Sequence, residues 1–170
     1  QSVWLEAVPQ TSIRSSRLAA DAEQETLALK GTAEGIQPGD RLKVSVWEGT
    51  QKVAEQESEG LQLTINIPAA IRWSPSNPFL YDLRITLVRK GKTIDEVRSY
   101  FGMRKISVAP DANGTQRMLL NDEMLFQYGP LDQGWWPDGL YTAPTDEALR
   151  FDIVKTKDLG FNMITKHVTV

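Results

Sequence analysis

The stretch Thr145–Val170, TDEALRFDIVKTKDLGFNMITKHVTV, contains a helix signal followed by a strand signal and decides how the end of the chain folds. Thr145 can accept hydrogen bonds from the free N–H groups of a first helical turn, and the two acidic residues after it suit the positive end of the helix dipole. Gly160 ends the predicted helix, because glycine adopts a positive φ without Cβ strain. The β-branched run 162–170 then predicts a strand.

The residues before this helix predict a hairpin and a loop. Two apolar runs, 118–120 and 124–126, flank Asn121-Asp122, which is typical of two strands joined by a tight turn. A segment rich in glycine, proline and tryptophan follows, from Gly129 to Pro144. Strand 124–126, loop, helix and final strand form one βαβ unit, and a parallel pair of strands needs more sheet beside it. We therefore expect this chain to be a fragment of a longer protein.

The first two thirds of the sequence predict a two-sheet β-sandwich of roughly 100 residues, because short alternating runs are separated by turn signals about every 8–12 residues. In Arg41–Trp47, for example, Leu42, Val44 and Val46 fall on one face of the predicted strand, and Lys43, Ser45 and Trp47 fall on the other. Gln37-Pro38-Gly39-Asp40 predicts a type II turn. The segment Trp73–Tyr81 contains two prolines, so we expect an extended corner that crosses from one sheet to the other. The predicted strands are 3–8, 12–19, 26–32, 41–47, 52–56, 61–67, 80–89 and 93–101.

Composition restricts the classes of partner. The net charge of −3 and the absence of a lysine or arginine cluster argue against nucleic-acid binding. No segment approaches the ~18 apolar residues of a membrane span. Cysteine is absent, which excludes disulfides and thiolate metal sites.

Several motifs together resemble glycoside hydrolase family 2, which includes β-galactosidases, β-glucuronidases and β-mannosidases. The motifs between residues 73 and 106 resemble the family's immunoglobulin-like domain, and the motifs from residue 119 onward resemble the region where its barrel begins. The motifs are Trp73…Asn77-Pro78-Phe79-Leu80-Tyr81-Asp82-Leu83, Asp95-Glu96-Val97, Phe101-Gly102-Met103-Arg104-Lys105-Ile106, Leu119-Leu120-Asn121-Asp122-Glu123, Gly129, and Thr145-Asp146-Glu147…Asp152…Lys155…Leu159-Gly160-Phe161-Asn162.

The resemblance implies three parts. Residues 1–8 would end a jelly-roll sugar-binding domain, 9–110 would form the immunoglobulin-like sandwich, and 111–170 would begin a (β/α)₈ barrel, or TIM barrel. The family hydrolyses O-glycosidic bonds of carbohydrate substrates by a retaining mechanism with two glutamates. Those glutamates are expected beyond Val170, so the fragment alone is expected to be inactive, and no cofactor is implied.

The loop after the expected first barrel strand contains residues suited to a carbohydrate subsite. Aromatic faces stack on sugar rings and carboxylates accept hydrogen bonds from hydroxyls, which makes Asp132, Trp135, Trp136 and Tyr141 candidates. The alternative is that these aromatic residues pack the loop against the rest of the fold.

Lys166 and His167 are two further candidates on the last predicted strand, where alternation places them on opposite faces. They lie near the position of the family motif Asn-x-apolar-Arg-small-small-His-Tyr-Pro, from which this sequence departs after Asn162-Met163-Ile164. His167 could equally be a packing residue. It is the only histidine, so we expect no metal site.

Two other functions stay open for this chain. It could be a noncatalytic carbohydrate-binding module, for which an exposed aromatic platform such as Trp47 would be the sign, or a structural spacer. Trp47 could instead pack between sheets or domains. Oligomeric state and location are not decided by the sequence, although the frequent export of polysaccharide-degrading enzymes favours the periplasm or secretion.

Overall fold

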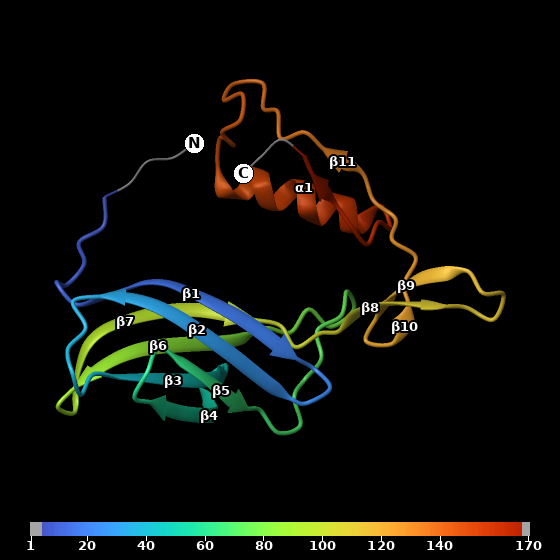
Figure 1. Cartoon of the computed structure of the whole chain (residues 1–170). Coiled ribbons are helices and arrows are strands. Elements are labelled where there is room, and N and C mark those ends of the chain that lie inside the picture. The colour runs from blue at the N-terminus through green and yellow to red at the C-terminus, as the bar shows by residue number, and fades with distance from the viewer. Residues whose placement is uncertain (1–4, 168–170) are drawn as a thin grey trace. The chain divides into compact units, whose positions relative to one another are not determined.

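The computed structural model describes residues 5–167 (Figure 1). The chain forms two compact units, one from Ala7 to Met124 and one that contains the residues from Leu125 onward. The first unit holds a β-sandwich and a small antiparallel sheet, and the second holds one helix between two short parallel strands.

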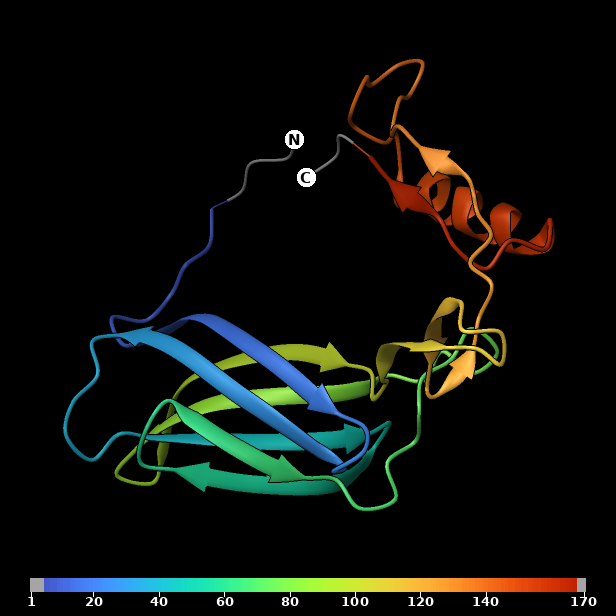
Figure 2. The same cartoon turned by 45° about the vertical axis from the view of Figure 1, so that its right-hand side comes forward.

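The sandwich consists of two antiparallel sheets that face each other (Figure 2). One sheet has three strands in the order β1-β2-β5, and the other has four in the order β4-β3-β6-β7. Sheets of three and four antiparallel strands are also typical of immunoglobulin-like sandwiches. The strands are β1 Ser12–Asp21, β2 Thr26–Glu34, β3 Arg41–Glu48, β4 Gln51–Ser58, β5 Gln62–Asn66, β6 Tyr81–Arg89 and β7 Lys92–Phe101.

The core between the sheets follows from strand alternation. In β3, Leu42, Val44 and Val46 are at most 1% exposed and point inward, while the residues between them belong to the outer face. Burying one such side chain contributes about 1.5–3 kcal/mol. The alternating residues of the central strands therefore hold the two sheets together. The fully buried core also includes Leu27, Ile65, Ile67, Leu83, Ile85, Leu87 and Met103.

The predicted sandwich is confirmed, with one strand prediction wrong. Residues 5–8 of the strand expected at 3–8 form no strand, and Val8 is 48% exposed. Residues 3 and 4 lie outside the described part of the chain. Alternation alone does not make a strand here, since a strand also needs a partner for its backbone groups. The corner 73–81 lies between β5 and β6, which belong to different sheets, as predicted.

The tight turns adopt the backbone conformations that their sequences favour. The amide of Asp40 donates to the carbonyl of Gln37 at 3.1 Å, and Gly39 between them has a φ of 89°, as expected for a type II turn. Lys90 and Gly91 between β6 and β7 both have positive φ, which is the geometry of a type I′ hairpin.

A buried ion pair closes one end of the sandwich. Arg89 Nε lies 2.6 Å from Asp40 Oδ1, and the side chain of Asp40 is 1% exposed. Arg89 also donates to the carbonyl of Gly35 and to the Thr11 hydroxyl, at 3.2 and 3.3 Å. Its guanidinium, followed by the amide of Gln37, lowers the pKa of Asp40 to about 2. The pair therefore ties the start of β1 to the loop between β2 and β3.

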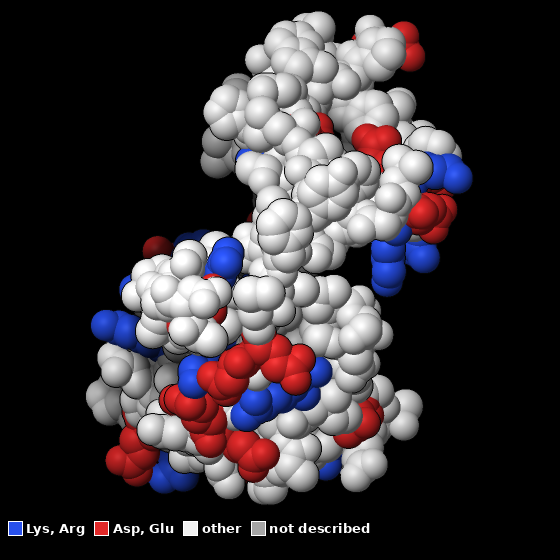
Figure 3. All heavy atoms as spheres, turned by 90° about the vertical axis from the view of Figure 1, so that its right-hand side faces the viewer, with Lys and Arg blue, Asp and Glu red and all other residues white. Residues whose placement is uncertain are grey.

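A small antiparallel sheet follows the sandwich in the order β10-β9-β8, with β8 Ile106–Pro110, β9 Gln116–Leu120 and β10 Glu123–Met124. The predicted hairpin around Asn121-Asp122 is confirmed, since both residues have positive φ. Strand β8 was not predicted. Asn121 attaches this sheet to the sandwich corner, because its Nδ2 donates to the Trp73 carbonyl at 3.0 Å. The face in Figure 3 shows acidic and basic side chains interspersed.

The second unit contains β11 Leu131–Asp132, α1 Asp146–Asp158 and β12 Thr165–Lys166. Strands β11 and β12 pair in parallel, so a βαβ connection is present. Our expectation that 124–126 is its first strand is wrong, because β10 ends at Met124 and pairs with β9. The first parallel strand lies instead inside the segment that we predicted to be a loop. The last part of the predicted final strand, 168–170, lies outside the described residues.

Helix α1 begins and ends as its sequence predicts. The Thr145 hydroxyl accepts a hydrogen bond from the Ala148 amide at 3.1 Å. At the other end, Gly160 has a φ of 87°, and its amide donates to the Lys157 carbonyl at 3.0 Å. The Phe161 amide donates to the Thr156 carbonyl, which completes a Schellman motif. No residue of the helix is buried.

No helix within residues 5–167 is long and apolar enough to cross a membrane.

Candidate functional site

The candidate site lies where the two parallel strands of the second unit end. Leu131 pairs with Thr165 and Asp132 with Lys166. The ladder continues past the strand ends, because the His167 amide donates to the Asp132 carbonyl at 2.9 Å. Parallel pairing thus brings the C-terminal ends of the two strands to one edge.

Asp132 and Lys166 form an ion pair at this edge. Lys166 Nζ lies 2.6 Å from Asp132 Oδ2, and the Gly134 amide donates to Asp132 Oδ1 at 2.7 Å. These donors, Lys166 first, lower the pKa of the Asp132 carboxyl, which is therefore ionised at neutral pH. A carboxylate has about four lone-pair sites and an ammonium three donors, so both groups keep capacity for further hydrogen bonds.

The segment after β11 folds back on itself and presents two aromatic rings. Trp136 and Leu140 exchange backbone hydrogen bonds of 2.8 and 3.1 Å. The rings of Trp135 and Tyr141 then meet with centroids 4.5 Å apart. Trp135 is 58% exposed and Tyr141 46%, so this pair keeps much of its aromatic surface accessible in the described chain.

Gly139 is required at the tip of this segment. A Cβ at Gly139 would lie 2.0 Å from the carbonyl oxygen of Thr142, which no side chain tolerates. Leu140 next to it has a φ of +55°, an unfavourable value for a residue with a branched side chain. Together the two positions fix the fold-back that brings Trp135 to Tyr141.

His167 lies next to the ion pair. Its Nδ1 is 3.2 Å from Gln133 Oε1, and its ring is exposed. Gln133 was not among the predicted residues, since a single glutamine carries no signal of its own in the sequence. Its position became apparent once the parallel pairing placed it opposite the end of β12.

The six predicted residues thus divide into three groups. Asp132 and Lys166 contact each other directly, and His167 follows Lys166 with Gln133 as its contact. Trp135 and Tyr141 form a separate ring pair. Trp136 is half-buried and takes part in the backbone bridge. Their proposed contact with a sugar stays a prediction.

Two further contacts in this unit hold together the segments that lead into β11 and β12. Asn162 Nδ2 donates to the Phe126 carbonyl at 2.8 Å, and Asn162 Oδ1 accepts from the Tyr128 amide at 2.9 Å. A Cβ on Gly129 would lie 1.8 Å from the Met163 carbonyl oxygen. The segment leading into β11 therefore lies directly against the segment leading into β12.

Among residues 5–167 no group of three or more histidine, cysteine, aspartate or glutamate side chains gathers where it could hold a metal ion.

Comparison with known proteins relates the chain to carbohydrate-active enzymes. The "Putative beta-glucuronidase" of Formosa agariphila is 25% identical over 155 residues, which are 85% of this chain and 14% of that protein. A β-glucuronidase structure from Ruminococcus gnavus has the same fold, with a TM-score of 0.79 at 19% identity over 93% of this chain and 26% of that chain. A β-glycosidase structure from Bacteroides vulgatus gives 0.73 at 24% identity over 91% and 21%.

This chain therefore spans between about a seventh and a quarter of the length of these relatives. The model of the family Glycosyl hydrolases family 2 matches residues 8–104, which are more than half of the chain and include all seven strands of the sandwich. The chain belongs to glycosyl hydrolases family 2.

Proposed function

We propose that this chain is part of an enzyme that hydrolyses O-glycosidic bonds of β-glycosides by the retaining, double-displacement mechanism. Membership of the family and the names of the relatives support hydrolysis of glycosides. A retaining enzyme needs two carboxyl groups about 5–5.5 Å apart, one as nucleophile and one as acid and base. We infer that this pair is supplied by sequence outside Gln1–Val170, and that the chain alone does not turn over a glycoside.

We further propose the domain assignment given above, in which residues 9–110 are the immunoglobulin-like sandwich and 111–170 begin a TIM barrel. The observation that supports the barrel is the parallel pair β11 and β12, joined through α1. In such barrels each strand is followed by a helix, and substrate groups gather at the C-terminal ends of the strands. Residues 1–8 would then connect to a preceding jelly-roll domain.

The edge that carries the ion pair of Asp132 and Lys166 is the candidate substrate site. Charged groups that already hold each other in place lose little freedom when a sugar hydroxyl binds to their remaining hydrogen-bonding positions. The exposed rings of Trp135 and Tyr141 offer apolar surface for the face of a sugar ring. Trp136 and His167 complete the proposed set of substrate contacts. The carbohydrate substrate is the one partner that this proposal names.

The test is hydrolysis of aryl β-glycosides by the complete natural polypeptide that contains this sequence, with the chain Gln1–Val170 beside it. The panel includes the β-glucuronide, because two of the relatives are named β-glucuronidases, and the β-galactoside and β-mannoside. Turnover by the longer polypeptide alone is the expected result. Turnover by the chain itself, or by neither protein, would contradict the proposal.

Retention of the anomeric configuration is tested separately. Proton NMR of the first product formed from the preferred substrate distinguishes the β-anomer, which a retaining enzyme releases, from the α-anomer. Early accumulation of the α-anomer would overturn the retaining mechanism while leaving glycoside hydrolysis intact.

A further inference from the structure

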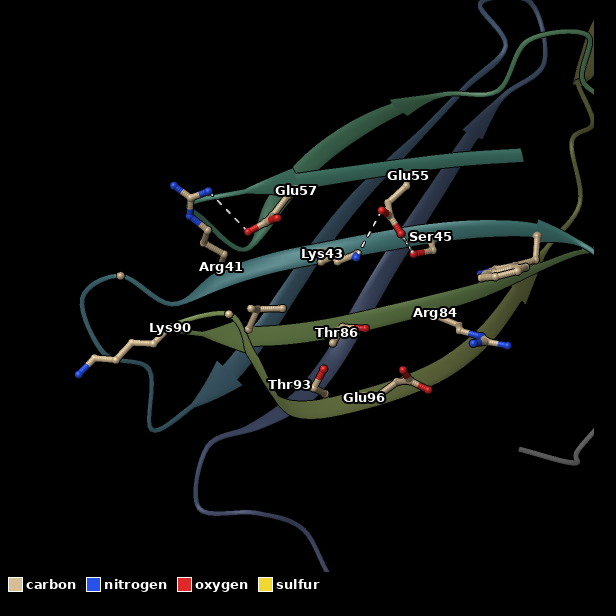
Figure 4. A pocket seen from close by; sticks show the side chains of 14 residues that line it. Arg41, Lys43, Ser45, Glu55, Glu57, Arg84, Thr86, Lys90, Thr93 and Glu96 are labelled. Atoms are coloured by element: carbon tan, nitrogen blue, oxygen red, sulfur yellow. Dashed lines mark hydrogen bonds and ion pairs between the residues drawn. The ribbon is translucent and has the colours of Figure 1, made fainter. Parts of the chain in front are cut away.

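The outer face of the four-stranded sheet is hollowed into a pocket of about 670 Å³ (Figure 4). Strands β4, β3, β6 and β7 all contribute to its lining. Val88 is the one aliphatic side chain among the described residues that line it, and charged or hydroxyl-bearing side chains make up most of the rest. This surface belongs to the sandwich unit and is distinct from the edge that carries Asp132.

Most charged groups of this pocket already have partners. Glu55 binds Lys52 at 2.9 Å and Lys43 at 3.3 Å, and accepts a hydrogen bond from Ser45 at 2.8 Å. Lys52 first, and then Ser45, lower the pKa of Glu55 to about 2. Arg41 lies 3.6 Å from Glu57. Figure 4 shows the contacts of Glu55 with Lys43 and Ser45, and of Arg41 with Glu57, on one side of the pocket.

Arg84 differs from these residues, because no carboxylate of the described chain lies within ion-pair distance of it. Its guanidinium instead stacks on the Trp47 ring, 4.6 Å from the ring centroid. The Trp47 Nε1 is buried and has no hydrogen-bond partner. One end of the pocket thus holds a half-buried cation without a counter-ion and an unsatisfied N–H group.

Two hydroxyl groups line the same pocket. Thr86 is 8% exposed and is the neighbour of Lys43 across the strands, and Thr93 projects from β7 into the same pocket. Neither hydroxyl has a hydrogen-bond partner in residues 5–167. They are therefore available to a ligand that both donates and accepts hydrogen bonds.

We propose that this pocket binds an acidic saccharide without cleaving it, with the acid group on Arg84. A guanidinium matches the two oxygens of a carboxylate or sulfate in a bidentate contact. Sugar hydroxyls meet the needs of Thr86 and Thr93, which a simple anion leaves unmet. The lack of apolar lining argues against a protein partner.

The acid group has two chemical sources, a uronic-acid carboxylate and a sulfate ester, and the experiment separates them. Titration calorimetry of the 170-residue chain compares tetragalacturonate, a sulfated tetrasaccharide and neutral cellotetraose. Binding of at least one acidic sugar, at least tenfold tighter than cellotetraose, is expected, and the tighter of the two identifies the acid group. Equal affinity for the neutral sugar, or no binding of any sugar, overturns the proposal.

Variants locate the site. Arg84→Gln is expected to weaken binding of the acidic sugar at least tenfold. The control Arg17→Gln removes an exposed arginine from β1 on the other sheet and should leave this affinity within twofold of the wild-type value. Thr86→Val keeps the side-chain shape and should also weaken binding. With this second pocket variant, the test does not depend on correct folding of Arg84→Gln alone. Unchanged affinity in both pocket variants would place any binding elsewhere and refute this site.

NMR gives an independent readout. The five tryptophans yield distinct indole N–H signals, and Trp47→Phe identifies the one from Trp47. The acidic sugar should shift this signal, and an oligomer of glutamate at equal charge should not. A shift caused equally by the glutamate oligomer would show simple charge attraction and overturn the assignment of a saccharide. Hydrolysis by the longer polypeptide is not needed for any of these outcomes.

Discussion

Asp132 and Lys166 are 34 positions apart in the sequence, yet their side chains meet at 2.6 Å where two parallel strands end. Helix α1 and its connections span the interval between them. The chain therefore forms this ion pair only when the βαβ connection is complete. Any variant that disturbs the connection should disturb the pair as well.

Loss of either charge should reduce hydrolysis by the longer polypeptide. In Lys166→Met the carboxylate of Asp132 loses its partner and the substrate loses a charged donor, so kcat/KM should fall by about tenfold to a hundredfold, the equivalent of one charged hydrogen bond. Asp132→Asn should lie in the same range. The control is Lys157→Met, which removes an exposed lysine in the last turn of α1. Wild-type kcat/KM in both site variants would exclude a role in substrate binding.

Gly129→Ala should disrupt the second unit. The new methyl group would lie 1.8 Å from the Met163 carbonyl oxygen, so the backbone must shift, at a cost of about 2–3 kcal/mol. The hydrogen bonds between Asn162 and the 126–128 segment should open first. Amide NMR signals of 126–132 and 161–166 report this change. Gly60→Ala is the matched control, because no atom lies within 4 Å of its added Cβ, and unchanged signals in Gly129→Ala would contradict the packing described.

The ion pair of Asp40 and Arg89 should make the sandwich sensitive to acid. The pKa of Asp40 falls from 3.8 to about 2 on folding. A lowered pKa means that the pair contributes stability above pH 3.8, and that this contribution disappears as the pH falls towards about 2. Thermal unfolding between pH 6 and pH 2 should therefore show a smaller loss of Tm with pH in Asp40→Asn than in the wild type.

The same variant should also lower Tm at neutral pH. Arg89 would keep its half-buried charge without a carboxylate, and we expect a decrease of at least ~5 °C. Glu34→Gln is the control, because Glu34 forms an exposed ion pair with Arg14 that should contribute little. An equal decrease in both variants would show that burial of the pair is not the cause.

Helix α1 should exchange its amide hydrogens quickly in the isolated chain. Leu149, Phe151, Ile153 and Val154 are each more than 40% exposed, so the helix lacks the tertiary packing from which most helical stability comes. In dilute solution we expect exchange within minutes along 151–159, and far slower exchange in β6, whose inward residues are fully buried. Equal protection of the helix and β6 would contradict this expectation.

Alternation and turn chemistry made the sandwich predictable. Strands β3 and β6 point every second side chain into the core, so the period of two is already present in the sequence. The turns at Gln37–Asp40 and Asn121-Asp122 were predictable for a similar local reason, because residues that tolerate positive φ stand where the chain reverses. The caps of α1 were predictable too, since Thr145 and Gly160 act on backbone groups within a few residues of themselves.

Short strands were not predictable. Strand β11 has two residues, Leu131 and Asp132, and no alternation can be recognised over such a length. It exists because β12 supplies hydrogen-bond partners from a distant part of the sequence. The segment 5–8 shows the reverse case, because it alternates but pairs with no strand.

The sandwich, the helix with its caps and the set of side chains suited to bind a sugar follow from the sequence, because they depend on local period and residue chemistry. Which of these side chains contact one another depends on the three-dimensional fold. The contact of Lys166 with Asp132, the ring pair of Trp135 and Tyr141, and the stacking of Arg84 on Trp47 all arise from strand register or chain reversal. Register is fixed by burial and backbone hydrogen bonds summed over whole sheets, and no single stretch of sequence contains that sum.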